Sequence, residues 1–234
     1  MNGARTKIYV KATREINEIV YTGIEFAEFI EYSPKSLDNL MIISGGSSAI
    51  SFESKFDRGL ELFEGRKNVY KLAKEAVYGL GDLCFVDYAS PGSTTGLSEE
   101  QIAELLYLGF MFKPLQSPFF EPLQNNFAYL AHDDGWYCKL YCRDMDDFGT
   151  VLCSKIIAAA AIQNSCEILY CTKNRILQLA EQGLLIDLEE LTQKSSHSIN
   201  LYSIGAYSDM DAVLNNCQTL KKEASQINQF CFCR

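Results

Sequence analysis

The sequence predicts an α+β fold, in which helices pack on a mixed β-sheet and the C-terminal part is βαβ-like. Three observations predict this class. Hydrophobic residues make up 47% and charged residues 22% of the 234-residue chain, which is the balance of a protein that buries an ordinary core. Short apolar runs bounded by glycine or polar residues recur along the chain, as strands do. Other segments place their apolar residues at helical intervals.

The first strand is predicted at residues 7–12. Residues 13–31 fit two alternatives: apolar residues at helical intervals favour a helix, whereas frequent β-branched residues favour a pair of strands. Strands are then predicted at 40–44 and 47–53. Gly45 and Gly46 between them are typical of a two-residue hairpin turn.

Two helices and a strand are predicted next. Residues 66–79 form an amphipathic pattern that ends at Gly79, a suitable left-handed stop. The continuous apolar run at 82–88 predicts a strand that is buried on both faces. Ser98 and Gln101 form a capping box, so a helix is expected to begin there, and we expect it to end at Gly109.

The segment after this helix contains Pro114, Pro118 and Pro122, which exclude a regular helix or central strand. Its phenylalanine and leucine residues indicate that it packs on the surface of the fold and does not swing free. We expect one domain over residues 1–234. If the chain has a subdomain boundary, it is expected near 113–122.

A β-hairpin is predicted around Asp134 and Gly135, since this dipeptide between aromatic-rich runs is a strong turn signal. Residue pairs across the hairpin then sum to 269, and alternation sorts the side chains onto two sides. One side is mainly apolar and carries Cys138 and Cys142, which lie too far apart to share a disulfide or a metal. The other side carries His132, Tyr137, Lys139 and Tyr141.

The C-terminal part is predicted to alternate helices and strands. Helices are expected at 144–163, with aspartates at its start, at 173–182, closed by Gly183, and at 209–226. Strands are expected at 166–171 and 200–205. This order implies a partly parallel sheet with right-handed crossovers.

Cysteine usage and hydropathy favour a cytoplasmic protein. The nine cysteines are scattered singly, no secretory leader is expected, and buried thiols in a reducing compartment are the preferred interpretation. No Cys-x-x-Cys pair occurs, so we expect neither a metal site nor a cofactor. The longest strongly apolar run, 156–162, is too short to cross a bilayer, so no membrane association is expected.

The formal net charge of −9 disfavours nucleic-acid binding and would favour a basic protein partner. The alternative is that this charge only keeps the protein in solution. The sequence does not define an oligomeric state.

Few groups of residues in the sequence could form a catalytic site. Serine or cysteine catalysis would have to use His132 or His197, the two histidines of the chain. We therefore predict a non-catalytic binding or accessory protein, of the inhibitor or immunity type, for a basic partner. The alternative is a hydrolase or transferase acting on a phosphorylated or nucleotide-like small molecule. That enzyme would use the loop at 44–48 or the loop at 90–96 as an anion cradle.

The candidate binding residues lie on the polar side of the hairpin. They are His132, Tyr137, Lys139 and Tyr141, with Arg143 beyond them, and they could contact a partner or an anion. The alternative is an ordinary sheet face that is solvated or covered by an overlying helix or loop.

Overall fold

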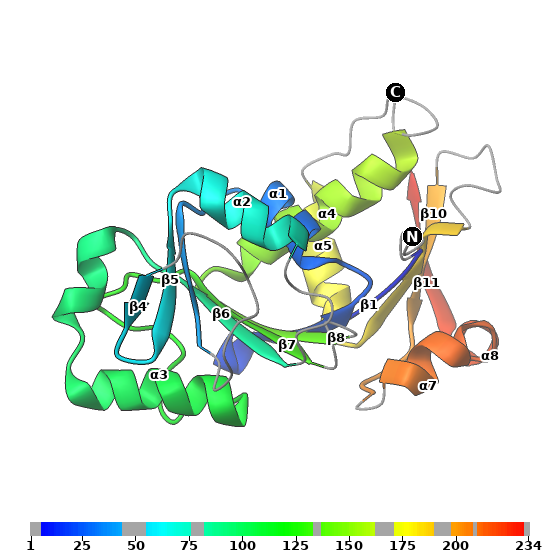
Figure 1. Cartoon of the computed structure of the whole chain (residues 1–234). Helices are drawn as coiled ribbons and strands as arrows, with labels where there is room; N and C mark the ends of the chain where they lie inside the picture. Colours follow the sequence, from blue (N-terminus) through cyan, green and yellow to red (C-terminus); the bar gives the residue numbers. More distant parts are fainter. Residues whose placement is uncertain are drawn as a thin grey trace.

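A computed structural model describes residues 6–43, 55–75, 82–132, 137–161, 171–189, 198–207 and 210–231. One 11-stranded sheet runs through these residues (Figure 1). Its strands, in sheet order, are β11 (Ser225–Cys231), β10 (Ser198–Ser203), β9 (Leu184–Asp187), β1 (Lys7–Thr13), β2 (Glu18–Thr22), β8 (Tyr137–Cys142), β7 (Phe127–His132), β6 (Leu83–Asp87), β3 (Asn39–Ile42), β5 (Leu60–Glu64) and β4 (Lys55–Asp57).

Helices cover both faces of this sheet. They are α1 (Phe26–Tyr32), α2 (Arg66–Glu75), α3 (Glu99–Met111), α4 (Met145–Ala161), α5 (Cys171–Ala180), α7 (Met210–Asn215) and α8 (Cys217–Glu223), with short 3₁₀ turns at Arg14–Ile16 and Pro91–Gly96. Figure 1 places α1, α2 and α4 on one face, which we call the upper face. It places α3 and the α7–α8 pair on the opposite, lower face. The α+β class is therefore confirmed.

The direction of the strands differs from the prediction. Every described pair of neighbouring strands is antiparallel, so the expected mixed sheet with a βαβ-like C-terminal part is wrong for these residues. The cause is β9, a four-residue apolar run after the helix stop at Gly183 that was not predicted as a strand. It lies between β1 and β10 and reverses the chain before β10 begins.

Gly183 lies between α5 and β9, and it is the helix stop that the sequence predicts. Its φ is +78°, and a Cβ atom there would lie 1.8 Å from the carbonyl oxygen of Gly205. The strand β11 at the end of the chain was not predicted, because the helical pattern of residues 209–226 extends over its first two residues. Two shorter helices, α7 and α8, take the place of the one expected there.

The N-terminal region combines the two alternatives. Residues 14–16 form a 3₁₀ turn, 18–22 form β2, and 26–32 form α1. Neither a single helix nor a pair of strands describes this stretch. The capping box of Glu25 and Glu28 starts the helix after β2 ends.

The upper face carries one continuous apolar cluster. It contains inward-facing residues of strands from β10 to β5, together with buried residues of α1, α2, α4 and α5. Aromatic rings form its centre: Phe26 stacks on Phe85 with centroids 4.4 Å apart and lies 4.6 Å from the Tyr129 ring. This layer is the main core of the protein.

The lower face carries two separate clusters. One packs α3 and residues 112–123 against β3, β5, β6, β7 and β8, and the other packs α7 and α8 against β1, β9 and β10. Figure 1 shows the two groups at opposite ends of this face. Between them, Lys11, Val20 and Lys139 are half-buried.

The helix α3 begins as predicted but ends later. Ser98 and Gln101 form the capping box, and the helix continues to Met111, with Phe112 in the left-handed conformation as its C-cap. Gly109 is not the stop. It is buried where α3 crosses the end of β3, and a Cβ atom there would lie 2.5 Å from Ile43 Cγ2.

Several predictions fall outside the described ranges. They concern the hairpin turn at Gly45 and Gly46, the strand at 47–53, the helix end at Gly79, the turn at Asp134 and Gly135, the strand at 166–171 apart from Cys171, and His197. Within the described ranges, no helix is both long and apolar enough to span a membrane.

Candidate functional site

The predicted hairpin is confirmed in its register. The six described pairs of β7 and β8 run from Phe127 opposite Cys142 to His132 opposite Tyr137, and each sums to 269. The two predicted sides therefore exist. One faces the upper cluster and the other faces the lower face of the sheet.

The cysteine thiols on the apolar side of the hairpin are buried and poorly reactive. The Cys138 thiol lies 3.0 Å from the Tyr129 hydroxyl, and both side chains are buried. Burial also raises the pKa of the Cys142 and Cys84 thiols far above the ordinary value. Such thiols stay protonated at neutral pH and make poor nucleophiles.

His132 lies inside an aromatic sandwich on the lower face. Its ring stacks on Tyr137 with centroids 4.6 Å apart and an interplanar angle of 5°, and Phe112 lies 4.5 Å away on another side. Burial lowers the pKa of His132; Lys139 acts in the same direction and Asp82 opposes it. Among the described residues its Nε2 atom has no hydrogen-bond partner. The ring is therefore placed for packing, and no described side chain accepts or donates a proton at Nε2.

Lys139 and Tyr141 are tied to neighbouring elements. Lys139 Nζ donates to the Phe112 carbonyl oxygen at 3.5 Å, at the C-terminal end of α3 where a cation is favoured. It also lies 3.9 Å from Glu18 Oε2, and the Tyr141 hydroxyl donates to the same carboxylate oxygen at 2.8 Å. Tyr141 is 4% exposed, so it belongs to the lower-face core.

Arg143 is exposed, but it holds the covering segment in place. Its Nε donates to the Asn125 carbonyl oxygen at 3.0 Å, and its guanidinium lies 4.9 Å from the centre of the Phe119 ring. The predicted polar side of the hairpin is thus partly covered by residues 112–125. Lys139 remains half-buried beside the end of α3, and Tyr137 is half-buried against the cluster of α7 and α8.

Two buried polar side chains anchor this covering segment. Asn125 is fully buried and bridges the Phe120 amide, the Pro118 carbonyl and the Phe127 carbonyl. Asp87, at the end of β6, accepts hydrogen bonds at 2.8 Å from the Asn126 amide, the Asn126 side chain and the Phe127 amide. Burial raises the pKa of Asp87 to about 6, although these hydrogen bonds oppose the shift.

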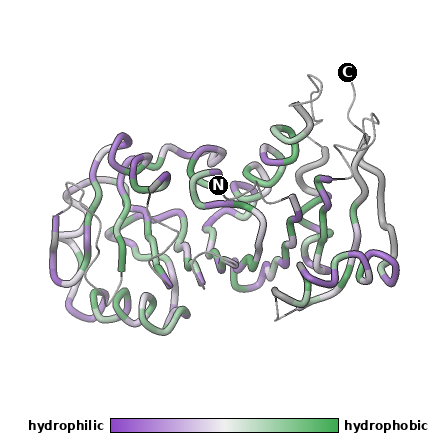
Figure 2. The backbone as a smooth tube through the Cα atoms, turned by 45° about the vertical axis from the view of Figure 1, so that its right-hand side comes forward, coloured by the Kyte–Doolittle hydropathy of each residue, from purple (hydrophilic) through white to green (hydrophobic). Residues whose placement is uncertain are grey.

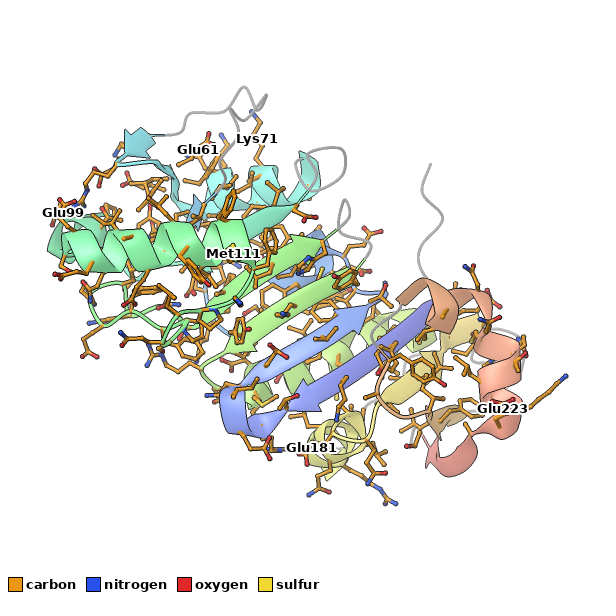
Figure 3. The ribbon with its side chains drawn as sticks, turned by 90° about the horizontal axis from the view of Figure 1, so that it is seen from below. Glu61, Lys71, Glu99, Met111, Glu181 and Glu223 are labelled. Atoms are coloured by element: carbon orange, nitrogen blue, oxygen red, sulfur yellow. The ribbon has the colours of Figure 1, made fainter. Side chains whose placement is uncertain are left out.

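An exposed apolar surface adjoins the polar side of the hairpin, and its residues were not among the predicted site residues. Four of the five exposed large hydrophobic side chains among the described residues lie within ten residues of sequence. We call them the α3 patch: Leu106 (40% exposed), Phe110 (80%), Met111 (45%) and Leu115 (57%). Figure 3 shows the Met111 end of α3 pointing toward the strands at the middle of the lower face.

The sequence carries a signal for this patch. In the last turns of α3, the apolar residues occupy more than one side, since Leu105 and Leu108 are buried while Leu106 and Phe110 are exposed. A helix that covers only one face of a sheet cannot bury both sets. Contiguous exposed apolar residues of this kind mark interaction surfaces more often than isolated ones do.

Acidic side chains lie at the other end of the same helix. Glu99 and Glu100 are exposed and Glu104 is half-buried; we call these three the acidic flank. Residues 97–126 contain four glutamates and one lysine, a formal charge of −3. Figure 2 shows α3 changing from hydrophilic at its start to hydrophobic over its second half.

The other candidate sites are the loops at 90–96 and 44–48 and His197. The loop at 90–96 forms a 3₁₀ turn whose Ser90 and Ser93 cap each other, and Arg58 donates to its Thr94 carbonyl oxygen at 2.8 Å. The loop at 44–48 and His197 lie outside the described ranges. Within those ranges no three His, Cys, Asp or Glu side chains are grouped as a metal site would require.

Comparison of the chain with protein-family models, with curated proteins and with solved structures gives no match.

Proposed function

We propose that the protein is a non-catalytic cytoplasmic binding protein of the inhibitor or immunity type, which docks a basic protein on its lower face. The α3 patch and the half-buried Tyr137 and Lys139 beside it would form the contact surface. The acidic flank and the overall charge would attract the partner.

The observation that carries the proposal is the concentration of exposed apolar side chains on one helix. Fully burying a Leu, Phe or Met side chain contributes roughly 1.5 to 3 kcal/mol, so Leu106, Phe110 and Met111 are suitable anchors for a partner. Flanking carboxylates accelerate association with a positively charged protein and favour that protein over acidic partners. This combination suits protein recognition better than capture of a small molecule, which requires a concave site.

The described side chains favour binding over catalysis. His132 packs between Phe112 and Tyr137, and five of the nine cysteines, Cys84, Cys138, Cys142, Cys153 and Cys217, are buried. A pocket beside the Lys35–Asp147 ion pair is too small for a substrate and would hold about one water molecule. Burial of these thiols disfavours their use as nucleophiles.

The test is affinity purification of the full-length chain from its native host, followed by reconstitution with the recovered protein. We expect one basic protein at 1:1 stoichiometry, whose own activity falls when the complex forms. Binding should weaken as salt rises, because the flank and the partner attract by charge.

Charge reversal supplies the matched control. The variant Glu99→Lys, Glu100→Lys, Glu104→Lys should bind at least tenfold more weakly. The variant Glu15→Lys, Glu31→Lys, Glu223→Lys makes the same change in net charge at exposed positions away from α3 and should bind nearly as the wild type does. Recovery of an acidic partner, or of no stoichiometric partner, would contradict the proposal. So would an equal loss of binding affinity in the two variants.

A further inference from the structure

The exposed face of α3 has a regular spacing along the helix. Glu99, Ala103, Leu106 and Phe110 are all exposed and follow one another at intervals of four, three and four residues. Side chains at this spacing form a single stripe along a helix. Met111 and Leu115 widen the stripe at its C-terminal end, beside Phe112 and the His132 ring that it contacts.

This stripe changes in character from one end to the other. Its first turn carries Glu99 and Glu100, and its last turn carries Phe110 and Met111. At 1.5 Å per residue the acidic and apolar ends are about 16 Å apart. A complementary ligand therefore needs apolar side chains at one end and cationic side chains about 16 Å away.

The backbone of α3 limits the form of this ligand. Its amides and carbonyls are used within the helix, so an extended peptide would gain none of the main-chain hydrogen bonds that a sheet edge offers. A helix, in contrast, packs its side chains into the spaces between those of α3. Both components of the stripe then lie within reach of one amphipathic helix of about four turns.

A second copy of this chain fits the stripe poorly. Two copies each carry a formal charge of −9, and a pair of antiparallel α3 helices would set Glu99 and Glu100 of one against Phe110 and Met111 of the other. Parallel helices would set carboxylate against carboxylate. A cationic partner avoids both the burial of carboxylates against apolar side chains and the repulsion between carboxylates.

We infer that the α3 stripe is a helix-docking site for an amphipathic helix of a basic protein. The partner's Leu or Phe side chains lie on Leu106, Phe110 and Met111, and its Lys or Arg side chains lie opposite the acidic flank. This inference rests on the proposed function and specifies the part of the partner that is recognised.

The experiment is a display selection on the immobilised full-length protein. The probe is a library of alanine-based 18-residue helical peptides in which one face varies among Leu, Phe, Ser, Lys and Glu. We expect selected peptides to carry Leu or Phe at positions i and i+4, with Lys two to three turns away. Their affinity should fall at least tenfold for Phe110→Asp and change less than twofold for Ile16→Asp, an exposed hydrophobic residue away from α3.

Two further comparisons test the charge pattern and the helical form. Selection on Glu99→Lys, Glu100→Lys, Glu104→Lys should replace the enriched Lys with Glu. A central proline in a selected peptide should reduce its affinity at least tenfold, because it breaks the helix.

Four results would overturn the inference: no enrichment, enrichment that is equal on Phe110→Asp, peptides without the selected lysines, or a wild-type dimer that Phe110→Asp dissociates. The proposed function can fail separately. If a basic partner binds wild type and Phe110→Asp equally, helix docking is wrong and the function stands. If helices are selected but the host yields no 1:1 partner, the function is wrong and helix docking stands.

Discussion

The two faces of the sheet are covered in different ways. On the upper face a single apolar cluster extends from β10 to β5, and α1, α2, α4 and α5 close over it. On the lower face two clusters lie at opposite ends, and residues of β1, β2 and β8 between them remain half-buried. The same strands therefore support a continuous core on one side and a divided, partly open surface on the other.

The two faces are also held in different ways. Upper-face residues contact each other through aromatic rings deep in the core. The cover of the lower face packs on the sheet through its own apolar cluster and is also held through main-chain atoms, by Asn125, Asp87, Lys139 and Arg143. A surface fixed by its backbone can present its side chains outward, and α3 does this with Leu106 and Phe110. We expect substitutions on the two faces to differ accordingly.

The largest effect is expected in the upper core. Phe26 is 1% exposed and its ring contacts those of Phe85 and Tyr129. Phe26→Ala should lower the free energy of unfolding by about 3 to 5 kcal/mol, because it removes buried apolar area and leaves a cavity. Urea denaturation followed by circular dichroism measures this change.

The matched control lies on the lower face. Phe110 is 80% exposed, and Phe110→Ala should change the free energy of unfolding by less than about 0.5 kcal/mol. Equal losses in the two variants would show that the α3 patch is part of the core, and the comparison of the faces would then be wrong.

A smaller but still large effect is expected where the lower cover joins the sheet. Asp87→Ala removes the acceptor of three hydrogen bonds from residues 126 and 127, and it leaves those donors in a largely buried site. At pH 4, where the contribution of Asp87 is full, we expect a loss of about 2 to 4 kcal/mol in the free energy of unfolding. A loss below about 1 kcal/mol would show that other contacts hold the segment.

The pH dependence of Asp87 tests the same anchor. Its pKa of about 6 in the folded protein lies above the ordinary 3.8, so its contribution to stability is full below about pH 4 and is lost as the pH rises through 6. A pKa difference of about two units corresponds to roughly 3 kcal/mol in the free energy of unfolding. From pH 4 to pH 7, Asp87→Asn should therefore gain stability relative to wild type by about that amount, measured by urea denaturation at each pH. A constant difference would contradict the raised pKa.

The hairpin shows how much the sequence can predict. A turn signal and strict alternation are local properties, and they placed all six described residue pairs of β7 and β8 correctly. The capping box of α3 was predicted for the same reason, because Ser98 and Gln101 are three residues apart. The position of Phe112 over His132 depends on where α3 ends, and Gly109 suggested an earlier end than the helix has.

Tertiary placement explains the other errors. The strand β9 is four residues long and acquires its identity from pairing with β1 and β10, partners that are distant in sequence. The α3 patch was missed although apolar residues occupy more than one side of the last turns of α3, because which of these sides stays exposed depends on what covers the helix. The predicted residues His132, Tyr137 and Lys139 nevertheless lie next to that patch, through their contacts with Phe112 and with each other.

The smallest expected effect concerns the His132 ring, at the boundary between the covered and open parts of the lower face. His132→Phe keeps an aromatic ring against Tyr137 and Phe112 and removes a buried Nε2 atom that has no hydrogen-bond partner among the described residues. At pH 7.5 we expect the free energy of unfolding to stay equal or rise by up to about 1 kcal/mol.

The pH dependence of this variant separates packing from a proton-transfer role for His132. Burial keeps the pKa of His132 below its usual 6.5, so the unfolded chain binds a proton in acid that the folded ring does not. The contribution of the neutral ring is present above about pH 6.5 and is lost as the pH falls. Wild type should therefore lose stability relative to His132→Phe between pH 7.5 and 5.5, in denaturation curves measured at both values. The opposite sign would mean that the folded protein stabilises the charged imidazole, and His132 would then belong to the charged part of the lower face and not to its packed part.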